Sequence, residues 1–323
     1  MFENSLEGFL LEDPTNLLEN LKDRLGKNEL GKNGLGKGDL KKSLFQLNET
    51  DNETDVCLIH GDALKVLSEF SDDFVDLVIV DPPYNVLKGV FWDEFKSVDD
   101  YLEFNILYLK ELERVVKRGA SVFVFWSERH FFLFDKVLKS VGLNLYKVII
   151  WHYPNLVKGP SNKRWLNTFD FIFHLVKGEK PKTFNAKFSE NENKDVWIFP
   201  KPQTNFKNDR KMHPTQKPIS LYKRLVKMFS NEGDIVLDPF CGSGTIFVAA
   251  IELNRNCYGI ELNENFVEIS RKRVEELINK NNLYRQGNLF EADRSFLRVN
   301  FEIVRHWSLF VRESFNYSYF SYL

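Results

Sequence analysis

Two stretches decide the fold of this chain: Val75-Asp76-Leu77-Val78-Ile79-Val80-Asp81-Pro82-Pro83-Tyr84 and Asp234-Ile235-Val236-Leu237-Asp238-Pro239-Phe240-Cys241-Gly242-Ser243-Gly244-Thr245. Each begins with an apolar, β-branched run that is typical of a buried parallel strand, and each continues into a polar turn. Open α/β sheets bind their ligands where such strands end. The two stretches therefore predict one site that holds two ligands.

Around them, from Val56 onward, short apolar runs alternate with amphipathic ones. We expect strands at 56–59, 75–80, 121–126, 146–151, 169–176, 235–237 and 257–261, and helices at 63–70, 101–117, 219–229, 245–254 and 266–279. Arg118-Gly119 is a usual stop signal for the second of these helices. The alternation predicts an α/β fold with a Rossmann-like, doubly wound, mostly parallel sheet.

The composition does not point to a particular partner or to a metal. The chain of 323 residues has 44 basic and 46 acidic side chains, so any site for a polyanion has to be local. Cys57, Cys241 and Cys257 stand at unrelated spacings, which indicates a reducing compartment and predicts no structural metal. The start lacks the features of a signal peptide, and no apolar run approaches about 18 residues, so we expect a cytoplasmic protein.

The two ends differ from the middle. Residues 1–54 contain an imperfect five-residue repeat, beginning Leu25-Gly26-Lys27-Asn28-Glu29, that builds neither a stable helix nor a solenoid layer. We expect a flexible leader, with a partner-binding arm as the alternative. The tail, 285–323, contains ten aromatic residues, which predicts burial against the core or at a dimer interface. The catalytic domain would span 55–284.

The glycine-containing turn suits a cofactor. Gly242 and Gly244 allow close approach of the backbone, and the helix that begins near Thr245 offers unpaired amides to a carboxylate. Asp238 can accept from an ammonium group, and Glu261, at the end of the next strand, from ribose hydroxyls. Phe247 stands where a dinucleotide fold needs a third glycine, and no P-loop lysine follows, which argues against NAD and ATP.

The chain resembles the β-group DNA amino-methyltransferases, in which a DPPY motif precedes an FxGxG motif. Asp81–Tyr84 match the first motif and Phe240–Gly244 the second. His213-Pro214-Thr215-Gln216-Lys217-Pro218 match the family's HPTQKP segment, and Gly61-Asp62-Ala63-Leu64 its GDAL segment. The resemblance covers about residues 56–280. It implies a permuted motif order within the Rossmann-like sheet and S-adenosylmethionine as the cofactor.

By this resemblance, Asp62 and Ala63 lie near the adenosine of the donor, and His213, Thr215 and Lys217 around its amino-acid end. The whole set of predicted cofactor-binding residues is Asp62, Ala63, His213, Thr215, Lys217, Asp238, Phe240, Gly242, Ser243, Gly244, Thr245, Glu261 and Asn263.

The DPPY segment suits catalysis at an exocyclic amino group, whose lone pair is delocalised into the base. Asp81 and the carbonyl oxygen of Pro82 can each accept one amino hydrogen, which favours a tetrahedral nitrogen with its lone pair directed at the methyl group. Pro82 and Pro83 restrict the turn. Tyr84 offers a flat face for a base flipped out of the duplex.

A basic segment lies between the two sets of motifs. Between Leu156 and Pro218 there are 13 Lys and Arg against six acidic residues, which fits contact with phosphates. Its part at about 180–211 is the predicted target-recognition insert; a solvated loop is the alternative. The resemblance sets Arg164-Trp165 and Asn167-Thr168-Phe169-Asp170 beside the target base. The predicted DNA-binding residues are Lys163, Arg164, Lys187, Lys207, Arg210 and Lys211.

Together these features predict a DNA methyltransferase that modifies the N6 amino group of adenine in a short duplex sequence, within or derived from a restriction-modification system. Asp81 favours adenine, because cytosine-N4 enzymes more commonly have serine there; a cytosine-N4 enzyme and a non-catalytic DNA-binding subunit stay as alternatives. RNA or protein amide methyltransferases would have the cofactor motif first. The partners left open are a second copy of the chain and a cognate restriction endonuclease.

Overall fold

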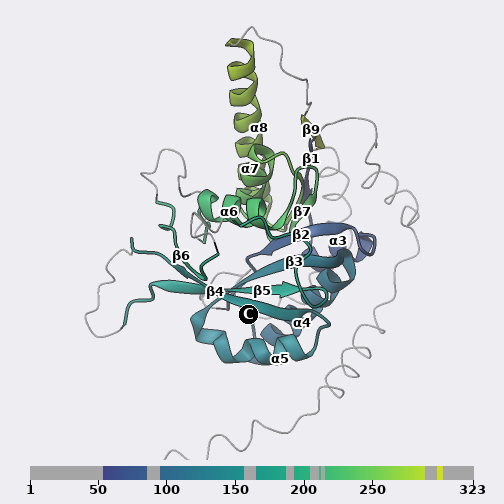
Figure 1. Ribbon diagram of the computed structural model, residues 1–323, viewed down its shortest axis with the longest axis vertical. Helices are drawn as coiled ribbons and strands as arrows, with labels where there is room; N and C mark the ends of the chain where they lie inside the picture. The colour runs from purple at the N-terminus through teal and green to yellow at the C-terminus, as the bar shows by residue number, and fades with distance from the viewer. Residues whose placement is uncertain are drawn as a thin grey trace, which may run out of the picture. The chain divides into compact units, whose positions relative to one another are not determined.

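The apolar runs of the chain form one sheet. Its strands are β1 (Thr54–His60), β2 (Val75–Val80), β3 (Val116–Trp126), β4 (Asn144–His152), β5 (Phe169–Val176), β6 (Val196–Ile198), β7 (Ile235–Asp238), β8 (Asn256–Glu261) and β9 (Leu297–Asn300). The computed structural model describes residues 54–85, 95–155, 165–186, 193–203, 211, 215–287 and 297–300. Within these ranges the sheet has nine strands, in the order β6-β4-β5-β3-β2-β7-β8-β1-β9 (Figure 1). β5 runs antiparallel to β3 and β4, and the other pairs are parallel.

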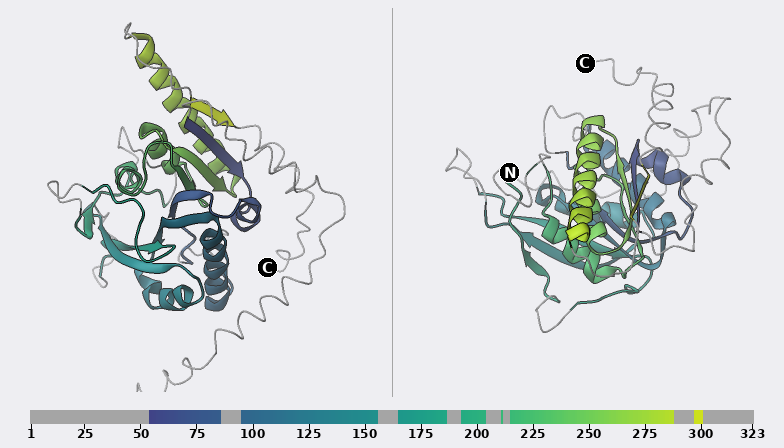
Figure 2. Two further views of the ribbon diagram at one scale, coloured as in Figure 1. Left: turned by 45° about the vertical axis from the view of Figure 1, so that its right-hand side comes forward. Right: turned by 90° about the horizontal axis from the view of Figure 1, so that it is seen from above.

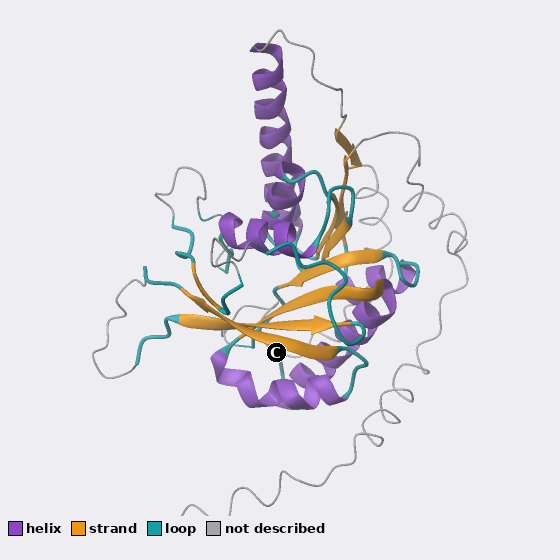
Figure 3. Ribbon diagram, viewed as in Figure 1, coloured by secondary structure: helices purple, strands orange, loops and turns teal. Residues whose placement is uncertain are grey.

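Helices cover both faces of this sheet. The helices α3 (Ala63–Glu69), α4 (Val98–Val115) and α5 (Phe134–Lys139) lie on one face, and α6 (Ile219–Phe229), α7 (Thr245–Glu252) and α8 (Glu264–Gly287) on the other (Figures 1 and 3). A 3₁₀ helix, Glu128–Leu133, leads into α5. Two turned views show the twisted sheet between the two helical layers (Figure 2). This arrangement confirms the predicted doubly wound α/β fold.

The residues of α4 and α7 explain how the first helix is capped and why both are buried. α4 starts where the Ser97 side chain accepts the Asp100 N–H at 3.0 Å, with two acidic residues in the first turn. Its apolar side, which includes Tyr101 and Leu109, is buried. In α7 every residue from Thr245 to Ile251 is buried, which suits a helix packed between the sheet and α6 and α8.

The expected helix stop at Arg118-Gly119 is wrong. α4 ends at Val115, and β3 begins at Val116 and runs through Gly119. Gly119 has φ +80°, its N–H donates to Lys177 O at 2.8 Å, and its carbonyl accepts the Lys182 N–H at 2.8 Å. The register of β3 on β2 shifts over this stretch, so the glycine serves a β-bulge and not a helix cap.

Several elements differ from the predicted set. β6 has only three residues and β9 four, too short for a periodic signal. β9 lies within the predicted tail and pairs with β1, and α8 continues to Gly287, past the expected domain boundary at 284. β1 begins at Thr54, the last residue of the predicted leader.

Other predictions fall outside the described ranges, namely those on residues 1–53 of the leader and on 288–296 and 301–323 of the tail. The described residues all belong to one compact unit, Gln46–Leu323. Among them, no helix has the length and apolar character needed to cross a membrane. That part of the chain also contains no group of three or more His, Cys, Asp or Glu side chains placed to hold a metal ion.

Candidate active site

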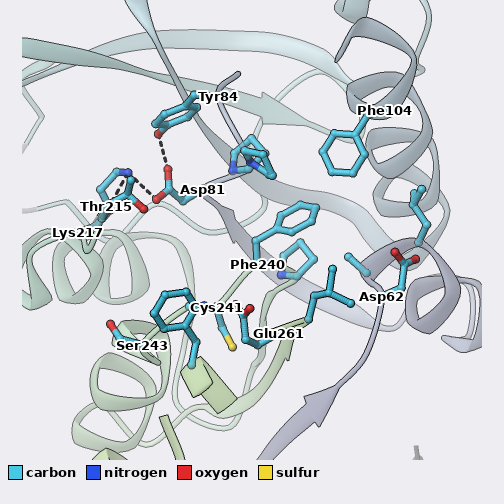
Figure 4. Close-up of a pocket in the computed structure, with 18 of the residues that line it drawn as sticks. Asp62, Asp81, Tyr84, Phe104, Thr215, Lys217, Phe240, Cys241, Ser243 and Glu261 are labelled. Atoms are coloured by element: carbon cyan, nitrogen blue, oxygen red, sulfur yellow. Dashed lines mark hydrogen bonds and ion pairs between the residues drawn. The ribbon is translucent and has the colours of Figure 1, made fainter. Parts of the chain in front are cut away.

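A pocket of about 450 Å³ opens at the carboxyl ends of four neighbouring strands, β2, β7, β8 and β1. Its lining consists of Gly61, Asp62, Ala63, Leu64, Asp81, Pro82, Pro83, Tyr84, Phe95, Lys96, Asp100, Phe104, Thr215, Gln216, Lys217, Tyr222, Pro239, Phe240, Cys241, Gly242, Ser243, Thr245, Glu261, Leu262 and Phe266. Figure 4 shows Asp81, Tyr84, Thr215 and Lys217 gathered at one end and Asp62 and Phe104 toward the other. The pocket therefore joins the predicted catalytic motif to the predicted cofactor loop.

Both oxygens of the Asp81 carboxylate are engaged by neighbouring side chains. The Tyr84 hydroxyl donates to Oδ1, and the Lys217 ammonium donates to Oδ2 at 2.5 Å (Figure 4). The side chains of Lys217 and Asp81 are only 5% and 13% exposed. Burial, with the nearby Asp81 charge, raises the pKa of Tyr84 well above its usual value, so Tyr84 stays a neutral donor. The carboxylate is thus fixed in orientation before any substrate arrives.

Lys217 lies on the catalytic side of the pocket. Its ammonium is 5.0 Å from the ring centroid of Tyr84 and 5.1 Å from that of Phe125, and it is 3.4 Å from the Thr215 carbonyl oxygen. The family resemblance predicts this lysine at the amino-acid end of the donor, and the ion pair with Asp81 is not part of that prediction. Lys217 links the HPTQKP segment directly to the DPPY motif.

The glycine loop after β7 is held in a conformation that favours glycine. Gly242 and Gly244 have φ of +53° and +76°. A Cβ on Gly244 would come within 2.8 Å of Ser270 Oγ, and Ser270 Oγ itself donates to the Gly242 carbonyl at 2.7 Å. The loop thereby brings backbone into the pocket at Gly242 and Ser243.

Glu261 ends β8 and supports this loop from below. Its Oε2 accepts the Gly242 N–H at 2.9 Å, and its Oε1 accepts the Asn263 N–H at 2.7 Å. Burial raises the pKa of Glu261, and these backbone hydrogen bonds oppose the shift. Each carboxylate oxygen has a second lone pair, so Glu261, which lines the pocket, can still accept from ribose hydroxyls.

Asp238 lies beneath the pocket and does not line it. It is 1% exposed, and its carboxylate accepts the Phe240 N–H at 3.1 Å and the Tyr222 hydroxyl at 3.3 Å. Burial raises its pKa to about 8, although the Phe240 hydrogen bond acts in the opposite direction. An ammonium group brought close by a ligand would favour its ionised form.

Phe104 of α4 forms an aromatic wall of the pocket together with Phe95 and Phe240, and neither Phe104 nor Phe95 is among the predicted site residues. Phe240 lies 5.7 Å from Phe104 and 5.4 Å from Tyr108, and Phe95 lies 5.3 Å from Phe104, between ring centroids. The available signal was the second aromatic stripe of α4, at positions 101, 104 and 108, beside its Leu and Ile stripe. These rings offer a flat, apolar surface to a planar ligand.

Most of the predicted site residues meet in this pocket. All four predicted catalytic residues line it, as do Asp62, Ala63, Thr215, Lys217, Phe240, Gly242, Ser243, Thr245 and Glu261. The Asp62 carboxylate also caps α3 by accepting the Lys65 N–H at 3.1 Å. Gly244 lies next to the lining, and the Asn263 side chain accepts the Asn265 N–H at the start of α8.

Of the predicted DNA-binding residues, only Lys211 lies within the described residues. His213 of the cofactor set, with Lys163, Arg164, Lys187, Lys207 and Arg210, lies outside the described residues. Lys211 is exposed, and its N–H donates to the Gln203 carbonyl at 3.2 Å. Trp165 is fully exposed.

Known proteins of similar sequence share one activity class. The chain is 34% identical over 238 residues to the Type II methyltransferase M.HpaI of Haemophilus parainfluenzae, which covers 69% of this chain and 75% of that protein. It is 28% identical over 256 residues to the Type II methyltransferase M.HinfI of Haemophilus influenzae. This match covers 72% of this chain and 71% of that protein.

Solved structures agree with this similarity. The M1.HpyAVI–SAM complex is 25% identical with a TM-score of 0.56 and covers 68% of this chain and 98% of that one. The PvuII DNA methyltransferase (cytosine-N4-specific) shares the fold, with a TM-score of 0.59 and 19% identity. The match covers 72% of this chain and 95% of that one. Residues 75–272 match the N6_N4_Mtase family, described as DNA methylase. The chain therefore belongs to the N6_N4_Mtase family of DNA methylases.

Proposed function

We propose that this chain transfers the methyl group of S-adenosylmethionine to the N6 amino group of adenine within a short sequence of duplex DNA. The observation that carries the proposal is the Asp81 carboxylate, fixed by Tyr84 and Lys217 at the end of a pocket built for a nucleoside-like ligand. The Type II relatives support a role as the modification enzyme of a restriction-modification system.

The pocket fits the donor in size and in chemistry. Its volume of about 450 Å³ falls within the usual range for small-molecule sites. The aromatic wall suits an adenine ring, Glu261 suits a ribose diol, and the backbone at Gly242 and Ser243 suits the amino-acid end. S-adenosylmethionine, when bound, supplies a methyl group on a positively charged sulfur.

The chain's own residues then act on the acceptor. Asp81 and the Pro82 carbonyl accept the two amino hydrogens and turn the nitrogen lone pair toward the methyl group, while Tyr84 presents its ring to the flipped base. As the nitrogen forms its bond to the methyl carbon, the carbon–sulfur bond breaks and its electrons stay on sulfur. The amino nitrogen becomes positive, and the negative Asp81 stabilises that charge until one proton leaves.

Adenine is the preferred target because an aspartate at the first position of the motif is negative. A charged carboxylate stabilises the cationic amino nitrogen more strongly than the serine that is common in cytosine-N4 enzymes. The basic side chains between residues 156 and 218, including the exposed Lys211, are the proposed contacts to the DNA phosphates.

The test is product analysis. Plasmid DNA is incubated with the purified full chain and isotopically labelled S-adenosylmethionine, digested to nucleosides and separated by mass spectrometry. Labelled N6-methyl-2′-deoxyadenosine is the expected product, and Asp81→Ala is the inactive control. Labelled N4-methyl-2′-deoxycytidine would show that the target is cytosine, and absence of any labelled nucleoside would overturn the enzymatic function. Sequencing of the modified sites gives the recognition sequence.

A further inference from the structure

A second polar cluster lies on the same edge of the sheet as the catalytic motif. β5 runs antiparallel to its neighbours, so its first residues, Phe169 and Asp170, lie beside the carboxyl ends of β3 and β4. β6 is parallel to β4, so Lys201, which follows β6, lies at this edge too. Asp170, Lys201 and Tyr153 thus continue the row of polar groups beyond Asp81, on the side away from the donor pocket.

These three side chains contact one another closely. The Lys201 ammonium is 3.6 Å from Asp170 Oδ2 and 3.6 Å from the ring centroid of Tyr153. Asp170 is 7% exposed and Tyr153 1%, whereas the Lys201 side chain is 41% exposed. The cluster therefore consists of a buried carboxylate and a buried tyrosine ring, with a partly exposed ammonium group against them.

The backbone of Lys201 is held rigidly. The Asn155 side chain donates to the Lys201 carbonyl and accepts the Lys201 N–H, both at 2.8 Å. Pro200 and Pro202 flank the lysine and restrict its backbone further. This anchoring preorganises the ammonium group for a contact.

Trp151 connects this cluster to the catalytic pair. Its ring centroid is 5.5 Å from the Lys201 ammonium and 6.0 Å from the Lys217 ammonium. The charges of Lys217 and Asp81 act on Lys201, and Asp170 contributes to the raised pKa of Tyr84. Two acid–amine pairs, Asp81 with Lys217 and Asp170 with Lys201, therefore lie near one buried indole.

The direction of methyl transfer decides which pair meets the base ring. The donor pocket lies over β2, β7, β8 and β1, so the amino nitrogen at Asp81 has to face that way. The ring attached to this nitrogen then extends in the opposite direction, over β3, β5 and β4. Lys201 and Asp170 lie at the edge of that part of the sheet.

We propose that Lys201, positioned by Asp170, donates a hydrogen bond to a ring nitrogen of the flipped target base and so selects that base. The inference rests on the proposed function and adds a specificity-determining contact to it. In adenine, N1 and N7 are the ring acceptors nearest the amino group, and an ammonium group is a donor only. Lys201 is therefore matched to an acceptor edge.

The test combines enzyme variants with altered bases. Duplex oligonucleotides carry the mapped recognition sequence with adenine, 1-deazaadenine or 7-deazaadenine at the target position, each analogue replacing one ring nitrogen by C–H. For the wild-type chain, one analogue should lower kcat/KM about 10- to 100-fold, the usual cost of a lost charge-assisted hydrogen bond. Lys201→Met should lower kcat/KM on adenine by a similar factor and then show less than about a threefold further loss with that analogue.

Two variants serve as controls. Lys147→Met removes a lysine from the first half of β4, where it forms an exposed ion pair with Asp195 at 2.7 Å, and should keep the wild-type response to both analogues. Asp170→Asn should reduce the wild-type penalty for the analogue only in part, as expected of a positioning residue. Each ratio compares two substrates with one enzyme preparation, so partial misfolding does not change it.

Three results would overturn the proposal: neither analogue slows the wild-type chain, Lys201→Met matches wild type on adenine, or Lys201→Met keeps the full analogue penalty. If product analysis identifies cytosine as the target, the proposed adenine specificity fails separately, and the same comparison is made with 3-deazacytosine. Lys201 would then be tested against the ring nitrogen next to the cytosine amino group.

Discussion

Removing either partner of the Asp81–Lys217 pair should destabilise the protein as well as stop catalysis. Asp81→Ala leaves the Lys217 ammonium, 5% exposed, without its counter-charge at 2.5 Å. Breaking a buried ion pair from one side costs about 3–5 kcal/mol. The Tyr84 and Phe125 rings, at 5.0 and 5.1 Å, still surround the ammonium, so we expect the lower value, about 3 kcal/mol. This corresponds to a melting temperature about 6 °C lower in a domain of this size.

The double variant Asp81→Ala/Lys217→Met separates the two roles. Methionine has nearly the length of lysine and no charge, so the double variant should recover to within about 1 kcal/mol of wild type. Thermal unfolding gives the stabilities, calorimetry the donor affinity, and nucleoside analysis the methyl transfer. Donor affinity should change little in Asp81→Ala. Additive losses of stability would show that the pair is not coupled, and turnover of the double variant above about a tenth of wild type would refute the catalytic role of Asp81.

Three further predictions concern the loop, a buried acid and the leader. Gly242→Val should abolish donor binding in calorimetry while the protein stays folded, because φ there is +53° and a side chain would enter the pocket; an unchanged dissociation constant would place the donor elsewhere. Asp238→Asn should become progressively more stable than wild type as pH rises from about 4 to 8, because the folded pKa of Asp238 is raised to about 8 and its unfolded value is about 3.9; a melting-temperature difference that is constant with pH would contradict this. Deletion of residues 1–53, which retains Thr54 at the start of β1, should leave the melting temperature and methylation rate unchanged, and a loss of several degrees would make the leader structural.

The elements that sequence reasoning found are those whose signal is local. β2, β5 and α6 have the predicted bounds because a run of β-branched residues or a clear helical period begins and ends within each segment. The donor, S-adenosylmethionine, was predicted from motifs, and membership in the family confirms it. Both kinds of signal are contained within a few consecutive residues.

What sequence reasoning missed depends on contacts between distant segments. Gly119 reads as a helix stop, yet its backbone is hydrogen-bonded to Lys177 and Lys182 in the segment that follows β5. Lys217 meets Asp81 across 136 positions, and nothing near either residue indicates the other. The aromatic wall of the pocket forms because folding brings Phe104 of α4 next to Phe240. Tertiary packing, which no local pattern encodes, decides each of these.

The order of the motifs along the chain matters less than the order of the strands in the sheet. β2 and β7 are neighbours, with Leu77 opposite Val236 and Val78 opposite Leu237, so the catalytic and cofactor segments meet although 153 positions separate Tyr84 from Leu237 in the sequence. The strands between them in sequence, β3 to β6, all lie on the outer side of β2. The strands of that outer half do not line the donor pocket. Their polar edge, with Asp170 and Lys201, faces the space into which a base at Asp81 extends under the proposed function. Under the proposed function, the sheet divides the site at β2: the strands on one side hold the donor, and those on the other recognise the acceptor.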